Sequence, residues 1–367
     1  MLRTTTYAHH GPVPTAPRPH WTPRAPAAQG QALRCRSGSA ALLLCAALAL
    51  APPVAAQRAQ GGQSAQNAQN TPVRDGAGPA MIPVQISPSV WYVQGLSALG
   101  SPVNQNFISN AGFVVTRSGV VVIDALGSPA LARRLLAAIA KITRKPVTHV
   151  IVTHYHADHI YGLQTFKAAG IKVIAHQAAR EYLNSETARL RLQASREELA
   201  PWIDAQTRLV EADEWLAFDR ELVLGGVRFA LRHAGPSHTA EDLVVHLPQE
   251  KVLFAGDLVF RGRIPFVGQT DSRQWIKALD ELLALQVKSL VPGHGPASFD
   301  ARADMALTRD YLVFLREAMG AAARNMDPFD EAYRAVDWSR FEKLPLFRAA
   351  NRMNAYNTYL LMEREAR

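Results

Sequence analysis

The chain has 367 residues, of which 48% are hydrophobic and 19% charged, and this composition excludes a fibrous or largely disordered protein. Lys and Arg number 40 against 31 Asp and Glu, a formal net charge of +9. Seven Arg and no acidic residue precede Asp75, so the excess belongs mainly to an N-terminal segment. The rest of the chain is nearly balanced in charge and predicts no nucleic-acid-binding surface.

Residues 1–56 have the pattern of a signal peptide or leader. Arg34 and Arg36 precede an apolar run over residues 40–51, and small residues follow as far as Ala56, the expected cleavage site. The run is shorter than the about 20 residues that a membrane-spanning helix needs. We therefore expect a periplasmic or secreted protein with no membrane span after processing. Both Cys residues precede Ala56, so the processed chain would have no thiol ligand or nucleophile.

Residues 57–81 are rich in Gln, Gly, Ala and Asn and predict a flexible linker. Strands and helices alternate beyond it, which predicts an α/β domain over residues 82–300. In chain order we expect strands at 90–93, 107–116 and 120–123, a helix at 130–142, a strand at 147–152, a helix at 160–169, a strand at 172–175, a helix from 178, strands at 227–233, 243–247 and 252–255, a helix at 272–285 and a strand at 289–291. Residues 301–367 predict a C-terminal helical extension.

Polar residues gather directly after the apolar strand expected at 147–152. Three His and one Asp occur within six residues, namely His154, His156, Asp158 and His159. Imidazole and carboxylate groups are the side chains that bind zinc or iron without thiols. Three more such side chains follow later strands in Gly-containing loops, namely His238, Asp257 and His294. The pattern predicts a metal site built at the ends of several strands.

These motifs, in this order, resemble the metallo-β-lactamase fold superfamily of hydrolases. The resemblance implies a four-layer αββα sandwich with two Zn²⁺ at one edge. It assigns His154, His156 and His238 to the first zinc, and Asp158, His159 and His294 to the second, with Asp257 bridging the two ions. Asp124 matches an acidic residue that hydrogen-bonds to the ligand loop and orients it.

Further stretches resemble one subgroup, the quinoprotein relay system zinc metallohydrolases. They are residues 104–115 (NQNFISNAGFVV), 260–266 and 351–363. Members of this subgroup are exported proteins associated with quinoprotein dehydrogenases, so the resemblance implies a periplasmic dehydrogenase partner and leaves the substrate open. Asp257 stands where one subclass of true metallo-β-lactamases has Cys, and it matches glyoxalase II-like and lactonase members instead.

The superfamily chemistry implies hydrolysis of a small molecule. A hydroxide bridging the metals would attack a carbonyl or phosphoryl centre, with Asp158 positioning this nucleophile or receiving its proton. The bond cleaved would be an ester, thioester, lactone or amide, β-lactams included. Arg261 and Arg263 are interpreted either as solvated loop residues or as contacts to an anionic substrate. Tyr155 either packs in the core or donates a hydrogen bond to an oxyanion.

Two alternatives to a zinc hydrolase stay open. The same fold hosts iron-dependent chemistry on oxygen and persulfides, so iron in the site would indicate a redox enzyme. The chain could instead act as a partner or maturation factor for a periplasmic dehydrogenase, using the linker or the helical extension for docking. The identity of the metal separates the first alternative from hydrolysis.

Overall fold

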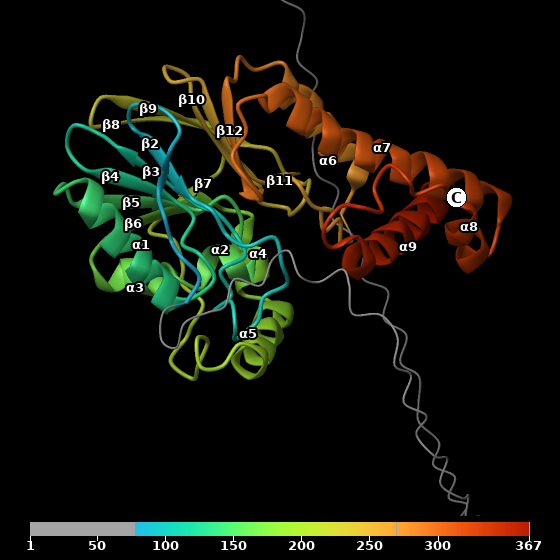
Figure 1. Cartoon of the computed structure of the whole chain (residues 1–367), viewed down its shortest axis with the longest axis horizontal. Helices are drawn as coiled ribbons and strands as arrows, with labels where there is room; N and C mark the ends of the chain where they lie inside the picture. Colours follow the sequence, from blue (N-terminus) through green and yellow to red (C-terminus); the bar gives the residue numbers. More distant parts are fainter. Residues whose placement is uncertain (1–77, 269, 367) are drawn as a thin grey trace, which may run out of the picture. The chain divides into compact units, whose positions relative to one another are not determined.

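The computed structural model describes residues 78–268 and 270–366. The predicted signal peptide and residues 57–77 of the predicted linker lie outside these ranges. Two sheets form the centre of the described part (Figure 1). The first contains, in spatial order, β1 (Val84–Gln85), β2 (Val90–Val93), β3 (Ala111–Val115), β4 (Val120–Ile123), β5 (Val147–Ile151), β6 (Lys172–His176) and β7 (Glu214–Leu216). The second contains β12 (Ser289–His294), β11 (Val252–Phe260), β10 (Leu243–Leu247), β9 (Val227–His233) and β8 (Arg220–Leu224).

The strands carry apolar residues on both of their faces. The inner faces of the two sheets therefore pack against each other. In β4, Val121 and Ile123 enter a core that they share with strands of the second sheet, such as Leu231 of β9 and Val245 of β10. The intervening Val122 belongs to a different core on the outer face. A strand that is buried on both faces lies inside a layered structure, as the run of apolar residues predicts.

Helices cover the outer face of the first sheet. The helix α1 (Pro129–Ile142) begins where Ser128 Oγ accepts a hydrogen bond from Leu131 N at 3.2 Å, and its apolar residues face the sheet. The helix expected at 160–169 is divided into α2 (Ala157–Ile160) and α3 (Leu163–Ala168). A Cβ at Gly162 would collide with Ala125 O, so the chain turns there in close contact with the neighbouring loop.

The outer face of the second sheet is covered by α6 (Ser272–Leu283) and the C-terminal helices. Trp275 and Leu279 of α6 pack in one core with Leu253 of β11 and Leu312 of α7 (Ala301–Asn325). The order of layers is therefore helix, sheet, sheet, helix, and the predicted α/β sandwich is confirmed (Figure 1).

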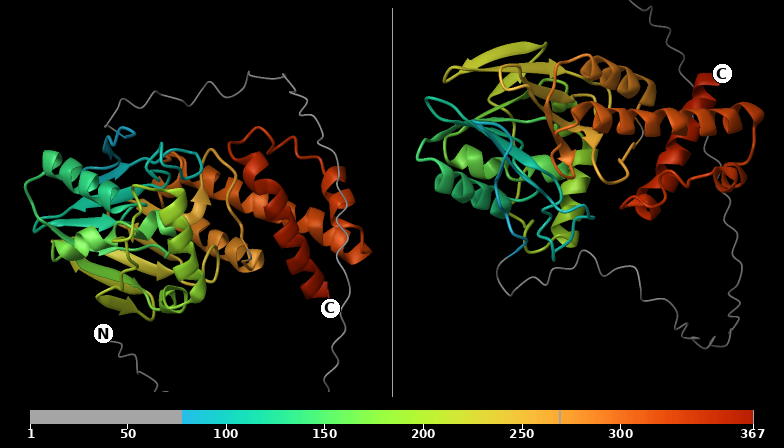
Figure 2. Two further views of the ribbon diagram at one scale, coloured as in Figure 1. Left: turned by 90° about the horizontal axis from the view of Figure 1, so that it is seen from below. Right: turned by 45° about the horizontal axis from the view of Figure 1, so that its top comes forward.

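The C-terminal region is helical, as predicted. It contains α7, α8 (Phe329–Ala335) and α9 (Phe347–Ala366), and α7 and α9 lie side by side at one end of the described part (Figures 1 and 2). Ala350 and Ala355 of α9 belong to the same core as α6 and β11, so these helices share a core with the second sheet. Within the described ranges, no helix is long and apolar enough to cross a membrane.

Other elements differ from the prediction in their bounds. The strand expected from residue 107 begins only at Ala111, because the residues before it bond to loops: Leu96 N donates to Phe107 O at 2.9 Å, and Asn110 N donates to Gly293 O at 2.8 Å. The strand expected at 252–255 continues to Phe260, which pairs with His294 of β12. The helix expected from 178 is two helices, α4 (Ala179–Leu183) and α5 (Glu186–Glu198).

Candidate metal centre

The loop after β5 carries His154, His156, Asp158 and His159, and Asp124 holds it in place. Asp124 ends the neighbouring strand β4, and its Oδ1 accepts a hydrogen bond from Thr153 N at 2.7 Å. Its Oδ2 accepts bonds from Thr153 Oγ1 at 2.8 Å and from His159 Nδ1 at 2.9 Å. The orienting role that the resemblance implied for Asp124 therefore has a geometric basis.

The same contacts determine which ring nitrogens face the centre. His159 donates its Nδ1–H to Asp124, so Nε2 is the nitrogen that would carry the lone pair when the ring binds a metal in its neutral form. Thr153 Oγ1 lies 3.0 Å from His154 Nδ1, and this hydroxyl already donates to Asp124, so His154 Nδ1 is the donor of that contact. Two Nε2 lone pairs are thereby directed into the centre.

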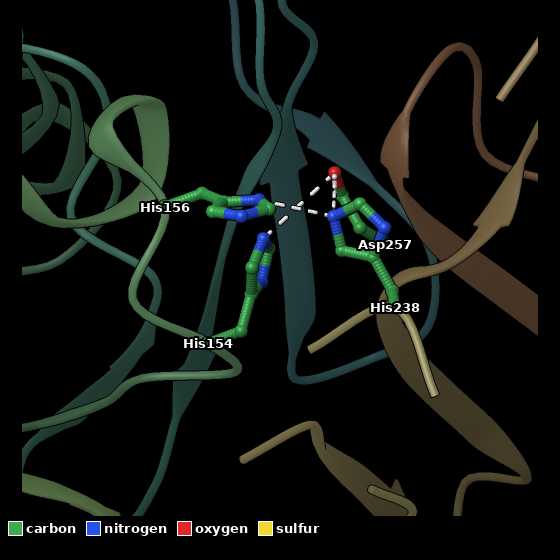
Figure 3. Close-up of side chains that lie close together, drawn as sticks. All are labelled: His154, His156, His238 and Asp257. Carbon is green, nitrogen blue, oxygen red and sulfur yellow. Dashed lines mark hydrogen bonds and ion pairs between the residues drawn. The ribbon is translucent and has the colours of Figure 1, made fainter. Parts of the chain in front are cut away.

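Four side chains form a first group that could hold a metal ion (Figure 3): His154, His156, His238 and Asp257. His156 Nδ1 lies 3.0 Å from His238 Nε2. Asp257 Oδ2 lies 3.4 Å from His238 Nε2 and 3.8 Å from His154 Nε2. Ligand atoms about 2.0–2.2 Å from a tetrahedral zinc lie roughly 3.3–3.6 Å from one another. The three separations, 3.0, 3.4 and 3.8 Å, lie within or close to this range.

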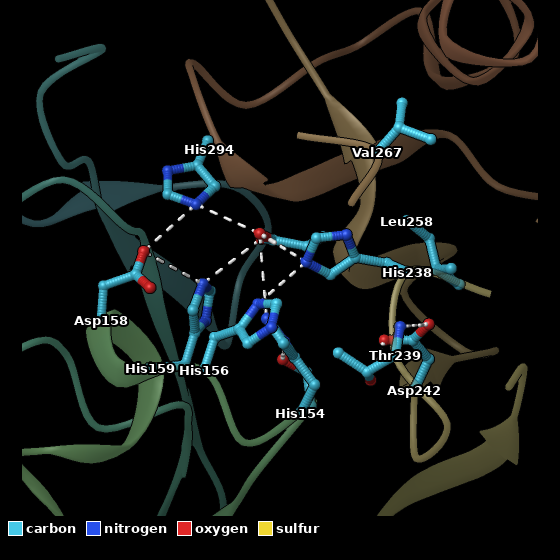
Figure 4. A network of polar contacts seen from close by, with 12 residues as sticks. His154, His156, Asp158, His159, His238, Thr239, Asp242, Leu258, Val267 and His294 are labelled. Atoms are coloured by element: carbon cyan, nitrogen blue, oxygen red, sulfur yellow. Dashed lines mark hydrogen bonds and ion pairs between the residues drawn. The ribbon is translucent and has the colours of Figure 1, made fainter. Parts of the chain in front are cut away.

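A second group, Asp158, His159 and His294, lies beside the first (Figure 4). Asp158 Oδ2 is 3.2 Å from His294 Nε2 and 3.6 Å from His159 Nε2. Asp257 also reaches this group, with its Oδ1 3.3 Å from His159 Nε2 and its Oδ2 3.3 Å from His294 Nε2. The carboxylate of Asp257 therefore contacts both groups.

Within the part of the chain that the structure describes, several atoms of this centre have no hydrogen bond. They are buried, and they include His154 Nε2, His159 Nε2 and Asp257 Oδ1. A buried polar atom without a partner costs about 1–3 kcal/mol, and a cation bound between these atoms would remove that cost. The donor set, nitrogen and carboxylate oxygen without sulfur, is one that zinc accepts.

Electrostatics also favour positive charge here. Burial lowers the pKa of His238 to about 3, so its ring is neutral. Burial would raise the pKa of Asp257, but His294 and His159 outweigh it and hold the carboxyl well below its usual range. Burial would likewise lower the pKa of His159, and the carboxylates of Asp158 and Asp257 raise it well above its usual value. The carboxylates thus stabilise a positive charge at the second group.

The loop that carries His294 depends on two features that the sequence did not single out. Asn110 spans it, with Nδ2 donating to Pro292 O at 2.7 Å and to Gly295 O at 2.8 Å. His294 itself donates its Nδ1–H to Ile108 O at 2.7 Å. The only sequence signal for Asn110 is a polar residue directly before a buried strand.

Glu241 connects the two other ligand loops. It is buried, and its Oε1 accepts a hydrogen bond from Tyr155 N at 3.0 Å. The loop of His238 is thereby tied to the loop of His154 and His156. Its neighbour Asp242 accepts bonds from Thr239 N at 2.8 Å and Thr239 Oγ1 at 2.7 Å, which closes the His238 loop on itself (Figure 4).

A cavity of about 530 Å³ opens onto both groups. His156, Asp158, His238, Asp257 and His294 line its floor. Its walls come from three other segments: Leu99 and Ile108 before β3, Tyr182, Arg191 and Leu199 around α4 and α5, and Arg263 and Phe266 after β11.

The structure separates the two arginines. Arg263 lines the cavity and is only 3% exposed, with its guanidinium 5.2 Å from the centre of the Phe266 ring. Arg261 lies outside the cavity lining, and its Nε donates to Asp304 Oδ2 at 2.7 Å. Of the two interpretations of Arg261, the structure favours a loop residue paired with an acidic residue of α7 over a contact to the substrate.

Of the two interpretations of Tyr155, the structure favours packing in the core. Its ring is buried in the core of the first sheet, and its hydroxyl donates to Val210 O at 3.2 Å, away from the cavity lining. Tyr182 lines the cavity instead, and burial raises the pKa of its phenol to about 12, which keeps it a neutral donor. Nothing in the sequence marks Tyr182, a single Tyr on a charged helix, as a cavity residue.

Comparisons with known proteins place the chain in a family. The family model of the metallo-beta-lactamase superfamily matches residues 105–294, just over half of the chain. A metallo-beta-lactamase type 2 of Bacillus sp. (strain 170) is 28% identical over 64% of this chain and 83% of its own length. The metallo-beta-lactamase type 2 of Bacillus cereus is 30% identical over 58% of this chain and 75% of its own length.

A solved structure supports the fold. The sec-alkylsulfatase Pisa1 from Pseudomonas sp. superposes with a TM-score of 0.61 at 20% identity, over 77% of this chain and 50% of that one. With the helix–sheet–sheet–helix layers and the clustered His and Asp residues, the matches show that this chain belongs to the metallo-β-lactamase superfamily of metal-dependent hydrolases.

Proposed function

We propose that the protein is an exported dinuclear zinc hydrolase that cleaves an ester, thioester, lactone or amide bond, β-lactams included, in a small anionic molecule. The single observation that carries the dinuclear site is the Asp257 carboxylate, which lies 3.3–3.4 Å from His238 on one side and from His159 and His294 on the other. Two bound Zn²⁺ would supply Lewis acidity and lower the pKa of water from 15.7 to about 7.

Asp158 is the residue best placed to handle the proton of the attacking water. It lines the cavity, and its side chain is 16% exposed, whereas His159, His294 and Asp257 are at most 5% exposed. Burial would raise its pKa, but His159 and His294 lower it, so the carboxylate is ionised at neutral pH. Ser109 Oγ fixes its backbone by donating to Asp158 O at 2.6 Å.

The position of Arg263 supports the proposal that the substrate is anionic. Among the described residues no carboxylate lies within 4.0 Å of its guanidinium, although the group is buried in the cavity wall. Its Nε donates to Ile264 O at 3.4 Å and its Nη1 lies 3.2 Å from His294 Nδ1, and neither partner is an anion. A buried charge without an opposite charge is costly, and a substrate carboxylate would offer two oxygens to the two-pronged donor face of Arg. The polar end of the substrate would then lie at Arg263, with the scissile bond over the floor of the cavity.

A sulfate ester is a second candidate substrate, and Arg263 is again the observation that favours it. A sulfate presents oxygens that suit a guanidinium as well as a carboxylate does. The structural neighbour named as a sec-alkylsulfatase shows that this fold accommodates such a substrate in another protein. Release of inorganic sulfate from dodecyl sulfate would distinguish this candidate from hydrolysis at a carbonyl.

We also propose export to the periplasm, from the signal-peptide pattern of residues 1–56, with a quinoprotein dehydrogenase as a partner. The two alternatives, an iron enzyme and a maturation factor, are tested by one experiment that measures metal content and turnover. The protein is purified from its native compartment without added metal and its elements are measured. About two zinc per chain, with turnover of carbonyl or sulfate esters that Asp257→Ala abolishes, supports the proposal. Iron, or two zinc without any turnover, contradicts it.

A further inference from the structure

The segment Phe260–Val267 forms the cavity wall that carries Arg263 and Phe266. After β11 ends at Phe260, the segment has no helix or strand, so its backbone groups find no partners in a regular ladder. Arg263 and Val267 are nevertheless buried. Buried backbone groups need hydrogen-bond partners from elsewhere in the chain.

The C-terminal helices and the turn before α9 supply several of them. Ile264 N donates to Pro345 O at 3.0 Å, just before α9. Thr308 of α7 contacts the backbone of Phe260 through its Oγ1, 3.4 Å from the nitrogen and 3.3 Å from the oxygen. The ion pair between Arg261 and Asp304 adds a second attachment to α7, the third in all.

Asn354 of α9 makes the most direct attachment near Arg263. Its Nδ2 donates to Pro265 O at 2.7 Å, and its Oδ1 accepts from Val267 N at 3.0 Å. The two bonds hold the backbone on both sides of Phe266, three residues beyond Arg263. Asn354 is completely buried, and Tyr311 OH, 3.0 Å from its Nδ2, holds its amide in this orientation.

We propose that Asn354 is a positioning residue that holds the Arg263 wall against the cavity, so that the C-terminal helices set the affinity for the anionic end of the substrate. The step from a fixed wall to substrate affinity rests on the proposed function. Without the amide, Pro265 O and Val267 N would be left buried and unpaired, and the wall would move to find other partners.

The chain offers a matched control one turn earlier on the same helix. Asn351 is also completely buried, and among the described residues its side chain bonds only to side chains of the helical region: Tyr311 OH donates to its Oδ1 at 2.8 Å, and its Nδ2 donates to Tyr333 OH at 3.1 Å. Asn354→Leu and Asn351→Leu therefore remove similar groups from the same core, and only the first touches the wall.

Hydrogen–deuterium exchange of residues 260–268 in the full, metal-loaded chain tests the attachment without any substrate. We expect Asn354→Leu to speed exchange there about tenfold, the factor expected when the net stabilisation of roughly one hydrogen bond is lost. Asn351→Leu should leave this segment at the wild-type rate. Equal acceleration in both variants, or none in Asn354→Leu, overturns the proposal. If the Leu variants do not fold, Asn354→Ser and Asn351→Ser give the same comparison.

Kinetics then test the link to the substrate. With 4-nitrophenyl hemisuccinate as the anionic ester and 4-nitrophenyl acetate as the neutral one, Asn354→Leu should raise KM for the anionic ester alone and leave kcat and metal content unchanged. An equal change for both esters overturns the positioning role. If the wild type hydrolyses neither ester nor dodecyl sulfate, the ester and sulfate ester parts of the proposed function fail, and the exchange result alone decides whether α9 holds the wall.

Discussion

Arg263 buries a guanidinium between two aromatic rings, with ring centres 5.6 Å away for Phe260 and 5.2 Å away for Phe266. Burial lowers its pKa, and the negative charges of Asp257 and Asp158 oppose that shift. An Arg side chain nonetheless remains protonated in proteins. A permanent positive charge therefore faces the cavity, and the aromatic rings fix its direction through cation–π contact.

Replacing Arg263 should change substrate affinity according to substrate charge. For Arg263→Ala we expect KM for an anionic substrate to rise about 10- to 100-fold, since a hydrogen bond to a charged group is worth roughly 1.5–3 kcal/mol. Arg263→Lys keeps the charge and loses the two-pronged geometry, so its KM should lie between those of the wild type and the Ala variant. Steady-state kinetics on matched anionic and neutral esters measure this, and an equal rise in KM for both would contradict the assignment.

At the scale of elements, the site is built where strands end. β4 and β5 are parallel neighbours, and Asp124 at the end of one holds the loop at the end of the other. β11 and β12 are also parallel neighbours; His294 is the last residue of β12, and Asp257 lies in β11 near its end at Phe260. The carboxyl ends of parallel strands meet at one edge of a sheet, and each sheet contributes one such pair to the centre.

Asp124→Asn tests this coupling between strands. An Asn cannot accept hydrogen bonds with both side-chain atoms, so either His159 or Thr153 loses its partner. Loss of such a supporting bond typically weakens metal binding 10- to 100-fold, and we expect about that change at the second group. Zinc competition with a chromogenic chelator measures it. Asp242→Asn is the control, because this buried carboxyl, with its pKa raised by burial to about 8, bonds to Thr239 rather than to a ligand ring. Equal losses in both variants would contradict the prediction.

At the scale of the whole described part, a pair of histidines connects the two sheets. His176 of β6 stacks on His233 of β9 with ring centres 3.7 Å apart. Burial, and then the neighbouring His233, lower the pKa of His176 to about 4 from its usual 6.5. The unfolded chain therefore binds a proton at His176 at a higher pH than the folded chain does.

This shift makes the sheet contact sensitive to acid. The contribution of His176 to stability is fully present above pH 6.5 and is lost as the pH falls toward 4, because protonation then favours the unfolded state. His176→Phe keeps the stack and removes the titrating nitrogen. Thermal unfolding between pH 7 and pH 4 should show a smaller fall of Tm in His176→Phe than in the wild type, and identical falls would show that the stack does not titrate in this range.

The sequence was sufficient for the α/β fold class and for the seven residues that the structure brings together in two groups. Both follow from local pattern: apolar strands bury both faces, and chemically distinctive side chains stand directly after them. Element bounds were less predictable, because Gly162 interrupts a helix through contact with Ala125, 37 positions earlier in the chain. A contact between residues so far apart in the chain cannot be predicted from the local sequence.

The environment of each cavity residue was decided only by tertiary structure. Arg261 and Arg263 are two positions apart in one loop, yet Asp304 of α7 pairs with the first while the second is buried facing the cavity. Tyr155 lies within the ligand motif itself, yet its hydroxyl donates a hydrogen bond to Val210 O in the core. The chemistry of a ligand motif can be predicted from the sequence because its residues are close together in the chain. The partners of a wall residue come from segments tens of residues away, and only packing brings them together.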